Sequence, residues 1–134
     1  ADKTLSEVNF EEAEMLILPG GIPGTPNLRA CTALCEKLKE FAANGKKVAA
    51  VCAAPTVLGD LGILEGKKAT CYPSFADKLA TGDYVKQPVV TDDNVITSRG
   101  MGTCIEFAGA IIAALKDKAT ADAVKEAIIY NDVY

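Results

Sequence analysis

Histidine and tryptophan are absent from this chain of 134 residues. Without histidine, the chain cannot supply the Cys–His and Ser–His–Asp arrangements in which an imidazole is the general base. The commonest zinc ligand is missing too, and no second pair of closely spaced cysteines is present, so we expect neither a metal nor a cofactor. A nucleophile in this sequence must therefore be activated by groups other than imidazole.

Positive charge is also scarce. The chain carries 14 Lys and Arg against 18 Asp and Glu, which gives a net charge of −4. The basic residues form no cluster, which argues against nucleic acid or an anionic membrane surface as partner. Long apolar runs are missing, and the N-terminal stretch ADKTLSEVNFEE is too polar for a signal peptide. We expect a cytoplasmic protein in which residues 1–134 form a single domain.

Cysteine is the residue type that the chain does have. Five cysteines, an odd number without the spacing of a small disulfide scaffold, indicate a reducing compartment. Cys31 and Cys35 are one helical turn apart, which is compatible with a metal or a vicinal pair, but we favour packing within a helix. Cys71 and Cys104 show no ligand spacing.

The stretch Lys46–Gly62, KKVAAVCAAPTVLGDLG, gives the strongest indication of a site. Val48–Val51 is a short apolar run preceded by Gly45, which is typical of a buried parallel strand. After Cys52, Pro55 opens a segment with helical spacing, at a position where proline has no N–H to lose. Cys52 therefore lies at a strand-to-helix turn, where parallel sheets bind ligands and free N–H groups stabilise a thiolate. We expect a nucleophile here; the alternative is a buried thiol that only packs.

A second apolar strand is predicted at Ala13–Leu18, and it ends in the glycine-rich loop Pro19–Gly24. Glycine allows a ligand to approach the backbone closely, although a plain tight turn has the same composition. The stretch Leu28–Asn44 has apolar residues at helical spacing and predicts a single crossover helix. Strand, helix and strand form a βαβ unit, so the glycine loop and Cys52 should lie side by side.

The C-terminal half predicts a hairpin of Pro88–Thr91 with Val95–Thr97, followed by a third glycine-bearing loop, Ser98–Gly102. Arg99 in this loop is either a solvated arginine or a clamp for a carboxylate or phosphate. Thr103 and Glu106 have the spacing of a capping box at the start of a helix that ends at Leu115. The remaining expected elements are a short strand, two helices and an apolar-aromatic tail, at Ala69–Cys71, Ser74–Ala80, Thr120–Ile129 and Tyr130–Tyr134.

Three motifs carry a resemblance to a known family: LPGG at Leu18–Gly21, AAVCAAPTVLG at Ala49–Gly59 and TSRGMGT at Thr97–Thr103. Together they resemble the ThiJ/PfpI superfamily over nearly the whole chain. CAAP and the ending IYNDVY are most similar to the YajL and parkinsonism-associated deglycase branch. Other branches place a histidine directly after the cysteine, and Ala53 at that position argues against peptidase activity.

The resemblance implies a flavodoxin-like three-layer α/β/α sandwich with a mostly parallel sheet, of the class I glutamine amidotransferase type, and a homodimer. It also implies that Cys52 is the nucleophile and the oxidation-sensitive thiol. The N–H groups of Gly21 and Ala53 would form an anion pocket. The other residues that it implies as lining this pocket are Gly20, Tyr72 and Arg99.

The sequence departs from the family pattern in three places. Tyr72 stands where relatives have a histidine, so a proton donor near the pocket is either lost or replaced by a phenol, and Met101 replaces a proline. Relatives also begin with a further β-α-β unit of about fifty residues, which supplies a central strand and a glutamate that is hydrogen-bonded to the cysteine. We therefore expect a companion segment of that length, with an acidic side chain about 3 to 3.5 Å from Cys52 Sγ.

The resemblance is compatible with more than one function. In the first hypothesis, Cys52 adds to small reactive carbonyls or early glycation adducts, as in a glyoxalase or deglycase, and the anion pocket holds the developing oxyanion. The alternative is a non-catalytic redox sensor or chaperone of oxidative stress in which the same thiol is oxidised to a sulfinate. A third hypothesis is a binding module that does not use the thiol. An older family label refers to thiamine biosynthesis.

Overall fold

The computed structural model describes residues 1–130. Its main sheet has four strands in the order β1-β2-β6-β5, of which β1, β2 and β6 run parallel and β5 runs antiparallel to β6. The bounds of these strands are Met15–Leu18 (β1), Lys47–Val51 (β2), Val89–Asp92 (β5) and Val95–Ser98 (β6). A separate parallel pair is formed by β3 (Lys68–Ala69) and β4 (Asp83–Tyr84).

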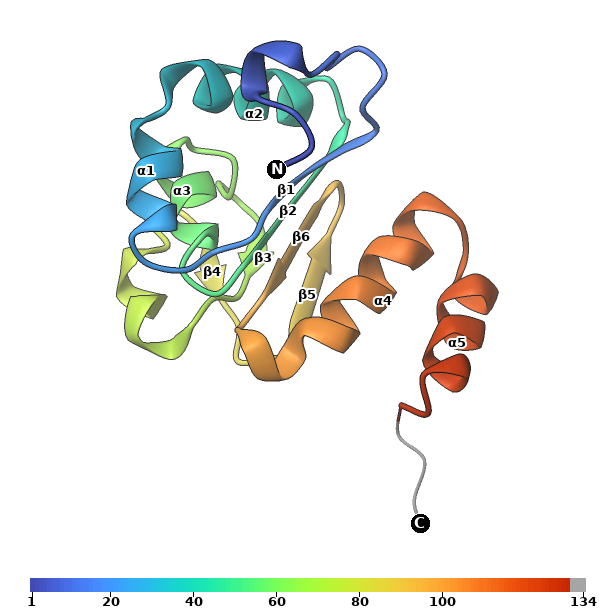
Figure 1. Cartoon of the computed structure of the whole chain (residues 1–134). Coiled ribbons are helices and arrows are strands. Elements are labelled where there is room, and N and C mark those ends of the chain that lie inside the picture. The colour runs from blue at the N-terminus through green and yellow to red at the C-terminus, as the bar shows by residue number, and fades with distance from the viewer. Residues whose placement is uncertain (131–134) are drawn as a thin grey trace.

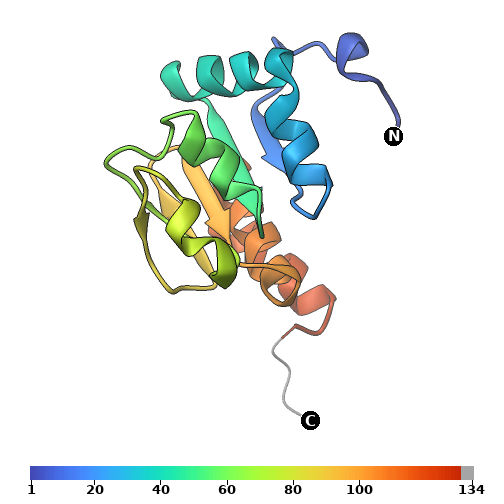
Figure 2. The same ribbon diagram turned by 90° about the vertical axis from the view of Figure 1, so that its left-hand side faces the viewer.

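Helices cover both faces of this sheet, as Figures 1 and 2 show. Helices α1, α2 and α3 lie on one face, α4 lies on the other, and α5 packs against α4 (Figure 1). Their bounds are Gly24–Ala30 (α1), Thr32–Ala43 (α2), Pro55–Asp60 (α3), Cys104–Leu115 (α4) and Lys118–Ala127 (α5), with short 3-10 turns at Leu5–Glu7 (η1), Pro73–Lys78 (η2) and Met101–Thr103 (η3). This arrangement is the predicted three-layer α/β/α sandwich.

The alternation of side chains along β2 explains why its sequence is apolar throughout. Val48 and Ala50 face a core with Leu38 of α2 and Leu58 of α3. Ala49 and Val51 face the opposite core, to which α4 contributes Phe107. Because successive residues of a strand point to opposite faces, a strand covered on both sides carries an uninterrupted apolar run.

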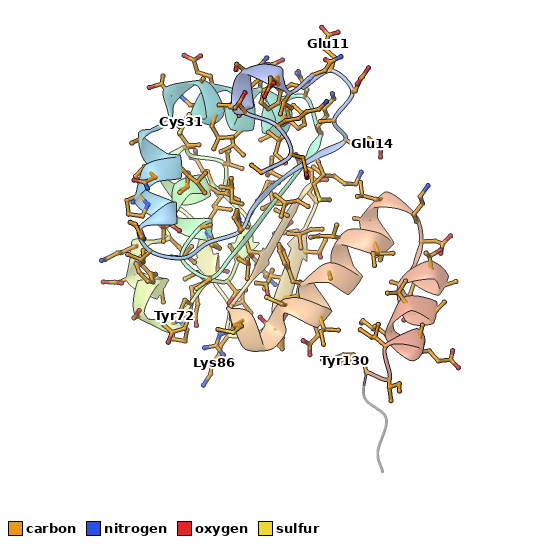
Figure 3. The ribbon with its side chains drawn as sticks, viewed as in Figure 1. Glu11, Glu14, Cys31, Tyr72, Lys86 and Tyr130 are labelled. Carbon is orange, nitrogen blue, oxygen red and sulfur yellow. The ribbon has the colours of Figure 1, made fainter. Side chains whose placement is uncertain are left out.

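The single crossover helix predicted for Leu28–Asn44 is wrong. The structure has two helices, which meet at Cys31 in an extended conformation (φ −83°, ψ 94°). Each helix has its own packing partner: α1 lies against α3, whereas α2 buries Leu34, Leu38 and Phe41 against the sheet. Figure 3 shows Cys31 at the junction of the two. Cys31 and Cys35 therefore do not share one helical face.

The capping box predicted for Thr103 and Glu106 is also wrong. No side-chain hydrogen bond caps the first turn of α4. The Thr103 hydroxyl instead accepts from the Gly100 N–H at 3.1 Å and pairs with the Ser98 hydroxyl at 2.7 Å. Thr103 thus closes the loop before the helix.

Within residues 1–130, no helix combines the length and apolar character that a membrane crossing requires.

Candidate functional site

The turn between β2 and α3 holds Cys52 in the left-handed region, with φ at 65°. Its N–H donates to the Ser98 carbonyl at 3.0 Å, and its own carbonyl accepts from the Tyr72 N–H at 2.8 Å. A side chain at positive φ costs about 1 to 2 kcal/mol and persists only where the surroundings hold it. Here both peptide groups of the residue are held, and the thiol remains partly exposed. The predicted strand-to-helix elbow is confirmed, and it is strained.

The glycine loop after β1 lies directly against this elbow. Gly20 has φ +87°, and a Cβ built on it would lie 2.5 Å from the Val51 carbonyl oxygen and 3.0 Å from Cys52 Cβ. Only glycine fits this contact. Gly21 also has a positive φ, +81°, but the space around it is open. The loop and the thiol are therefore side by side, as the βαβ pattern predicts.

Two N–H groups at this end of the sheet are free to bind a ligand. Across residues 1–130, neither the Gly21 N–H nor the Ala53 N–H has a hydrogen-bond acceptor. The direction of the Ala53 N–H is fixed, because the C=O and N–H of one trans peptide point to opposite sides and Tyr72 holds the Cys52 carbonyl. Unpaired N–H donors beside a thiol are the components of an anion pocket.

Tyr72 and Arg99 lie on the same edge of the fold. The Tyr72 ring packs on the Ser98–Gly102 loop, since a Cβ at Gly100 would lie 3.5 Å from its Cδ2, and the side chain is 47% exposed. Figure 3 shows Tyr72 at the end of the molecule where β2 and β6 finish. Arg99 is half-buried, and its Nε atom is buried without a partner among the described residues. Because this nitrogen has no access to solvent, an anionic ligand can bind Arg99 only through the part of the side chain that remains exposed.

The position of Cys71 next to the elbow could not be predicted from its spacing to the other cysteines. The side chain is fully buried beside the elbow, and Sγ contacts the Tyr72 carbonyl oxygen at 3.3 Å. Burial raises the pKa of the Cys71 thiol to about 11; the Arg99 charge opposes this rise, while Cys52 and Asp77 add to it. Cys71 therefore stays protonated at neutral pH. The apolar residues around Cys71 keep its thiol protonated, and its spacing from other cysteines plays no part in this.

The hydroxyls of the TSRG motif position the strands around the thiol. Thr97 Oγ1 accepts from the Thr70 N–H at 2.9 Å, which holds the end of β3 and the following Tyr72 next to β6. Ser98 Oγ donates to the Pro88 carbonyl at 2.8 Å and so fixes the start of β5. Thr97 and Ser98 of this motif thus hold neighbouring segments in place, and Arg99 is the residue of the motif that remains for a ligand.

A second network, which the sequence did not suggest, supports the elbow from α1. The buried Thr56 hydroxyl donates to the Ala53 carbonyl at 2.7 Å and accepts from Arg29 Nη2 at 2.8 Å. Arg29 Nε also pairs with Asp60 Oδ2 at 2.6 Å. These contacts join α1 to the first turn of α3 through Thr56 and to its last residue, Asp60.

A hollow of about 510 Å³ lies at the opposite end of the sheet, between α2 and the β5–β6 turn. Its one carboxylate, Asp93, faces Lys67 at 3.5 Å, and no thiol or hydroxyl lines it. Its only nucleophilic groups from the described part of the chain are the amines of Lys39 and Lys67, and Lys67 is held by the Asp93 carboxylate. The partly exposed thiol of Cys52 and the unpaired N–H groups lie at the other end of the sheet. Within residues 1–130, no three His, Cys, Asp or Glu side chains are grouped to hold a metal.

Residues 1–114, which include the cysteine elbow, the glycine loop and the TSRG loop, match one family model, described as the DJ-1/PfpI family. The chain belongs to this family. The predicted resemblance to the ThiJ/PfpI superfamily is therefore confirmed.

Individual relatives support the same assignment. Protein DJ-1 homolog A of Arabidopsis thaliana is 41% identical over 132 residues, which are 96% of this chain and 34% of that protein. Protein dj-1beta of Drosophila melanogaster is 37% identical over 97% of this chain and 72% of its own length. A Caenorhabditis elegans relative named glutathione-independent glyoxalase DJR-1.2 is 38% identical over 86% of this chain and 62% of that protein. The chain spans about a third of the Arabidopsis protein, so the activity of a whole relative is not transferred by identity alone.

Solved structures show the same fold. Drosophila melanogaster DJ-1beta superposes with a TM-score of 0.85 at 35% identity, over 92% of this chain and 68% of that one. Oxidized Toxoplasma gondii DJ-1 superposes with a TM-score of 0.83 at 34% identity, over the same shares. The flavodoxin-like architecture predicted from the motifs is thus confirmed.

Proposed function

We propose that this protein is a cysteine-dependent enzyme of the stress response that acts on reactive carbonyls or early glycation adducts. The observation that carries the proposal is the strained elbow: Cys52 is held at positive φ, partly exposed, beside two unpaired N–H groups. A relative of this chain bears the name of a glyoxalase.

The first step is addition of the Cys52 thiolate to an aldehyde carbon. A C–S bond forms, the π electrons of the carbonyl move to its oxygen, and the resulting alkoxide takes a proton to give a hemithioacetal. The N–H groups of Gly21 and Ala53 hold the alkoxide, and Arg99 binds an anionic group of the substrate. Each oriented donor of this kind contributes on the order of 3 kcal/mol to the transition state.

With a 2-oxoaldehyde as substrate, the net reaction adds one water and yields a 2-hydroxy acid. The aldehyde carbon is oxidised and the neighbouring ketone carbon is reduced, so no external oxidant is needed. The proton must move between these carbons, which requires an acid or base near Sγ. Tyr72 offers a phenol at this edge, and it is the candidate from the described residues.

A stronger base can come from a companion segment of the kind that the family resemblance implies. The outer edge of β1 carries no strand among residues 1–130, and unpaired edge groups invite a further strand. We place the acidic partner of Cys52 on such a segment of about fifty residues. A structure of the assembled protein without a carboxylate beside Cys52 Sγ would contradict this part of the proposal. We propose a homodimer as the working form.

A second candidate function is redox sensing or chaperoning through oxidation of the same thiol. The specific observation in its favour is that a similar solved structure is described as oxidized DJ-1. The pocket would then hold the negative charge of a sulfinate in place of an alkoxide.

An assay of methylglyoxal turnover distinguishes the enzyme hypothesis from the redox-sensor hypothesis. It compares the wild type with the variants Cys52→Ser and Cys104→Ser. Cys104 is the matched control because it is an exposed thiol outside the elbow. The enzyme hypothesis expects hydroxy acid formation that Cys52→Ser abolishes and Cys104→Ser preserves. Oxidation of Cys52 by stoichiometric peroxide with no turnover in any sample would favour the sensor and overturn the enzyme.

A further inference from the structure

Arg29 lies outside the elbow, yet it links α1 and α3, the helices that follow the two turns in which Gly21 and Ala53 lie. It is the penultimate residue of α1, which follows the glycine loop, and its guanidinium reaches across to α3. The side chain is 43% exposed, so its ion pair with Asp60 contributes little to the free energy of unfolding. Its geometry is more informative than its charge, because two guanidinium nitrogens bind two different residues of α3.

One branch of the network leads to Ala53. Arg29 Nη2 donates to Thr56 Oγ1 at 2.8 Å, and this donation leaves the Thr56 hydroxyl proton to the Ala53 carbonyl at 2.7 Å. Thr56 is 2% exposed, so no water replaces either partner without rearrangement. Together with the Tyr72 N–H on the Cys52 carbonyl, this bond fixes both peptides that flank Ala53.

The other branch leads to Gly21 through the backbone of α1. The Thr25 N–H, in the first turn of α1, donates to the Gly21 carbonyl at 2.8 Å. A shift of α1 would therefore carry the second residue of the glycine pair with it. A Cβ built on Gly21 would meet nothing within 4 Å, so no side-chain packing at this residue resists such a shift.

We infer that Arg29 is a positioning residue that sets the separation of the Gly21 and Ala53 N–H groups by tying α1 to Thr56. The inference rests on the proposed function of these N–H groups as an anion pocket. A displacement of about 1 Å at such a site costs up to a hundredfold in rate, so a flexible α1 would weaken the pocket without unfolding the protein. Arg29 itself does not touch the substrate.

The test compares alkylation of Cys52 by iodoacetate, an anion, and by neutral iodoacetamide, with peptide mapping of the product. Both reagents consume the same thiolate, so the ratio of their rate constants reports the pocket and cancels the thiolate fraction. The variants are Arg29→Met, which keeps the aliphatic stem, and Thr56→Val, which removes the hydroxyl at constant charge. Arg29→Lys is the conservative variant, and Lys118→Met removes one positive charge from the exposed Lys118–Asp122 pair on α5.

We expect the iodoacetate to iodoacetamide ratio to fall about fivefold in Arg29→Met and in Thr56→Val, to recover in part in Arg29→Lys, and to stay unchanged in Lys118→Met. A fall in Arg29→Met without one in Thr56→Val would mean that only the charge matters, and it would overturn the inference. An unchanged ratio in both variants would overturn it as well. If the ratio falls as expected while no sample turns over methylglyoxal, the positioning role stands and the enzyme hypothesis fails.

Discussion

Replacing Gly20 by alanine tests whether the glycine loop and the cysteine elbow form one unit. The new Cβ would lie 2.5 Å from the Val51 carbonyl oxygen, closer than such atoms approach in proteins, and 3.0 Å from Cys52 Cβ, tighter than nine in ten Cβ contacts. Neither neighbour can rotate away, because one is the backbone of β2 and the other is the first atom of the Cys52 side chain. The loop and the elbow must therefore separate.

The expected cost has two parts. Alanine at φ +87° is strained by about 1 to 2 kcal/mol, and forcing an extra methyl group into a packed contact costs about 1 to 3 kcal/mol more. Gly45→Ala is the matched control, since Gly45 has φ +72° with nothing within 4 Å and precedes the opposite end of β2. It carries the strain without the clash. We expect Gly20→Ala to lose about 2 to 5 kcal/mol of unfolding free energy and Gly45→Ala about 1 to 2.

Urea unfolding measures both losses, and the rate of Cys52 alkylation by iodoacetamide in the folded protein measures the effect on the site. Gly20→Ala should change this rate several-fold, because Cys52 shifts out of its strained conformation, and Gly45→Ala should leave it unchanged. Equal loss of stability in the two variants, together with equal alkylation rates, would refute the claim that Gly20 supports the elbow.

Three further predictions concern other side chains of the site. Iodoacetamide at neutral pH should alkylate Cys52 before the more exposed Cys104 and long before the buried Cys71, and peptide maps with Cys104 modified first would place the reactive thiol elsewhere. Arg99→Gln should weaken turnover or binding of anionic carbonyl substrates about tenfold and of neutral ones less, with a small change in melting temperature. A large drop in melting temperature at unchanged activity would show that Arg99 stabilises the fold and does not bind the substrate. The folded state raises the pKa of Cys71 to about 11, so the free energy of unfolding should fall by about 2 to 3 kcal/mol as pH rises from 9 to 11. Cys71→Ala should flatten the plot of unfolding free energy against pH in this range. Equal slopes for the wild type and Cys71→Ala would contradict the burial of this thiol.

The order of the main elements and the position of Cys52 at a strand-to-helix turn could be predicted from the sequence, because both depend on local patterns. The apolar run of β2, its stop at Cys52 and the proline three residues later specify a strand, a turn and a helix. The hairpin of β5 and β6 follows from two β-rich runs around Asp93 in the same way. These features need no knowledge of distant residues.

The break at Cys31 and the failed capping box could not be predicted, because distant partners decide them. Nothing between Leu28 and Asn44 is a helix breaker; in the structure Arg29 of α1 binds α3, α2 packs against the sheet, and the two helices meet at Cys31. Thr103 has the composition of a cap, but the Ser98 hydroxyl competes for it. The Arg29–Thr56 network escapes prediction for the same reason, since its members are 27 residues apart.

The strand β1 shows how far an apolar pattern can be extrapolated. Its sequence predicts helices on both faces, yet Ile17 is 46% exposed. Ile17 pairs with Ala49 of β2, whose side chain faces the α4 core, so Ile17 lies on the face that α4 covers. Helix α4 packs mainly over β2, β5 and β6, and the β1 residue that reaches its core is Met15, at the start of the strand. The apolar pattern of β1 therefore predicts cover on both faces of the strand, whereas the position of α4 determines how much of that cover residues 1–130 supply.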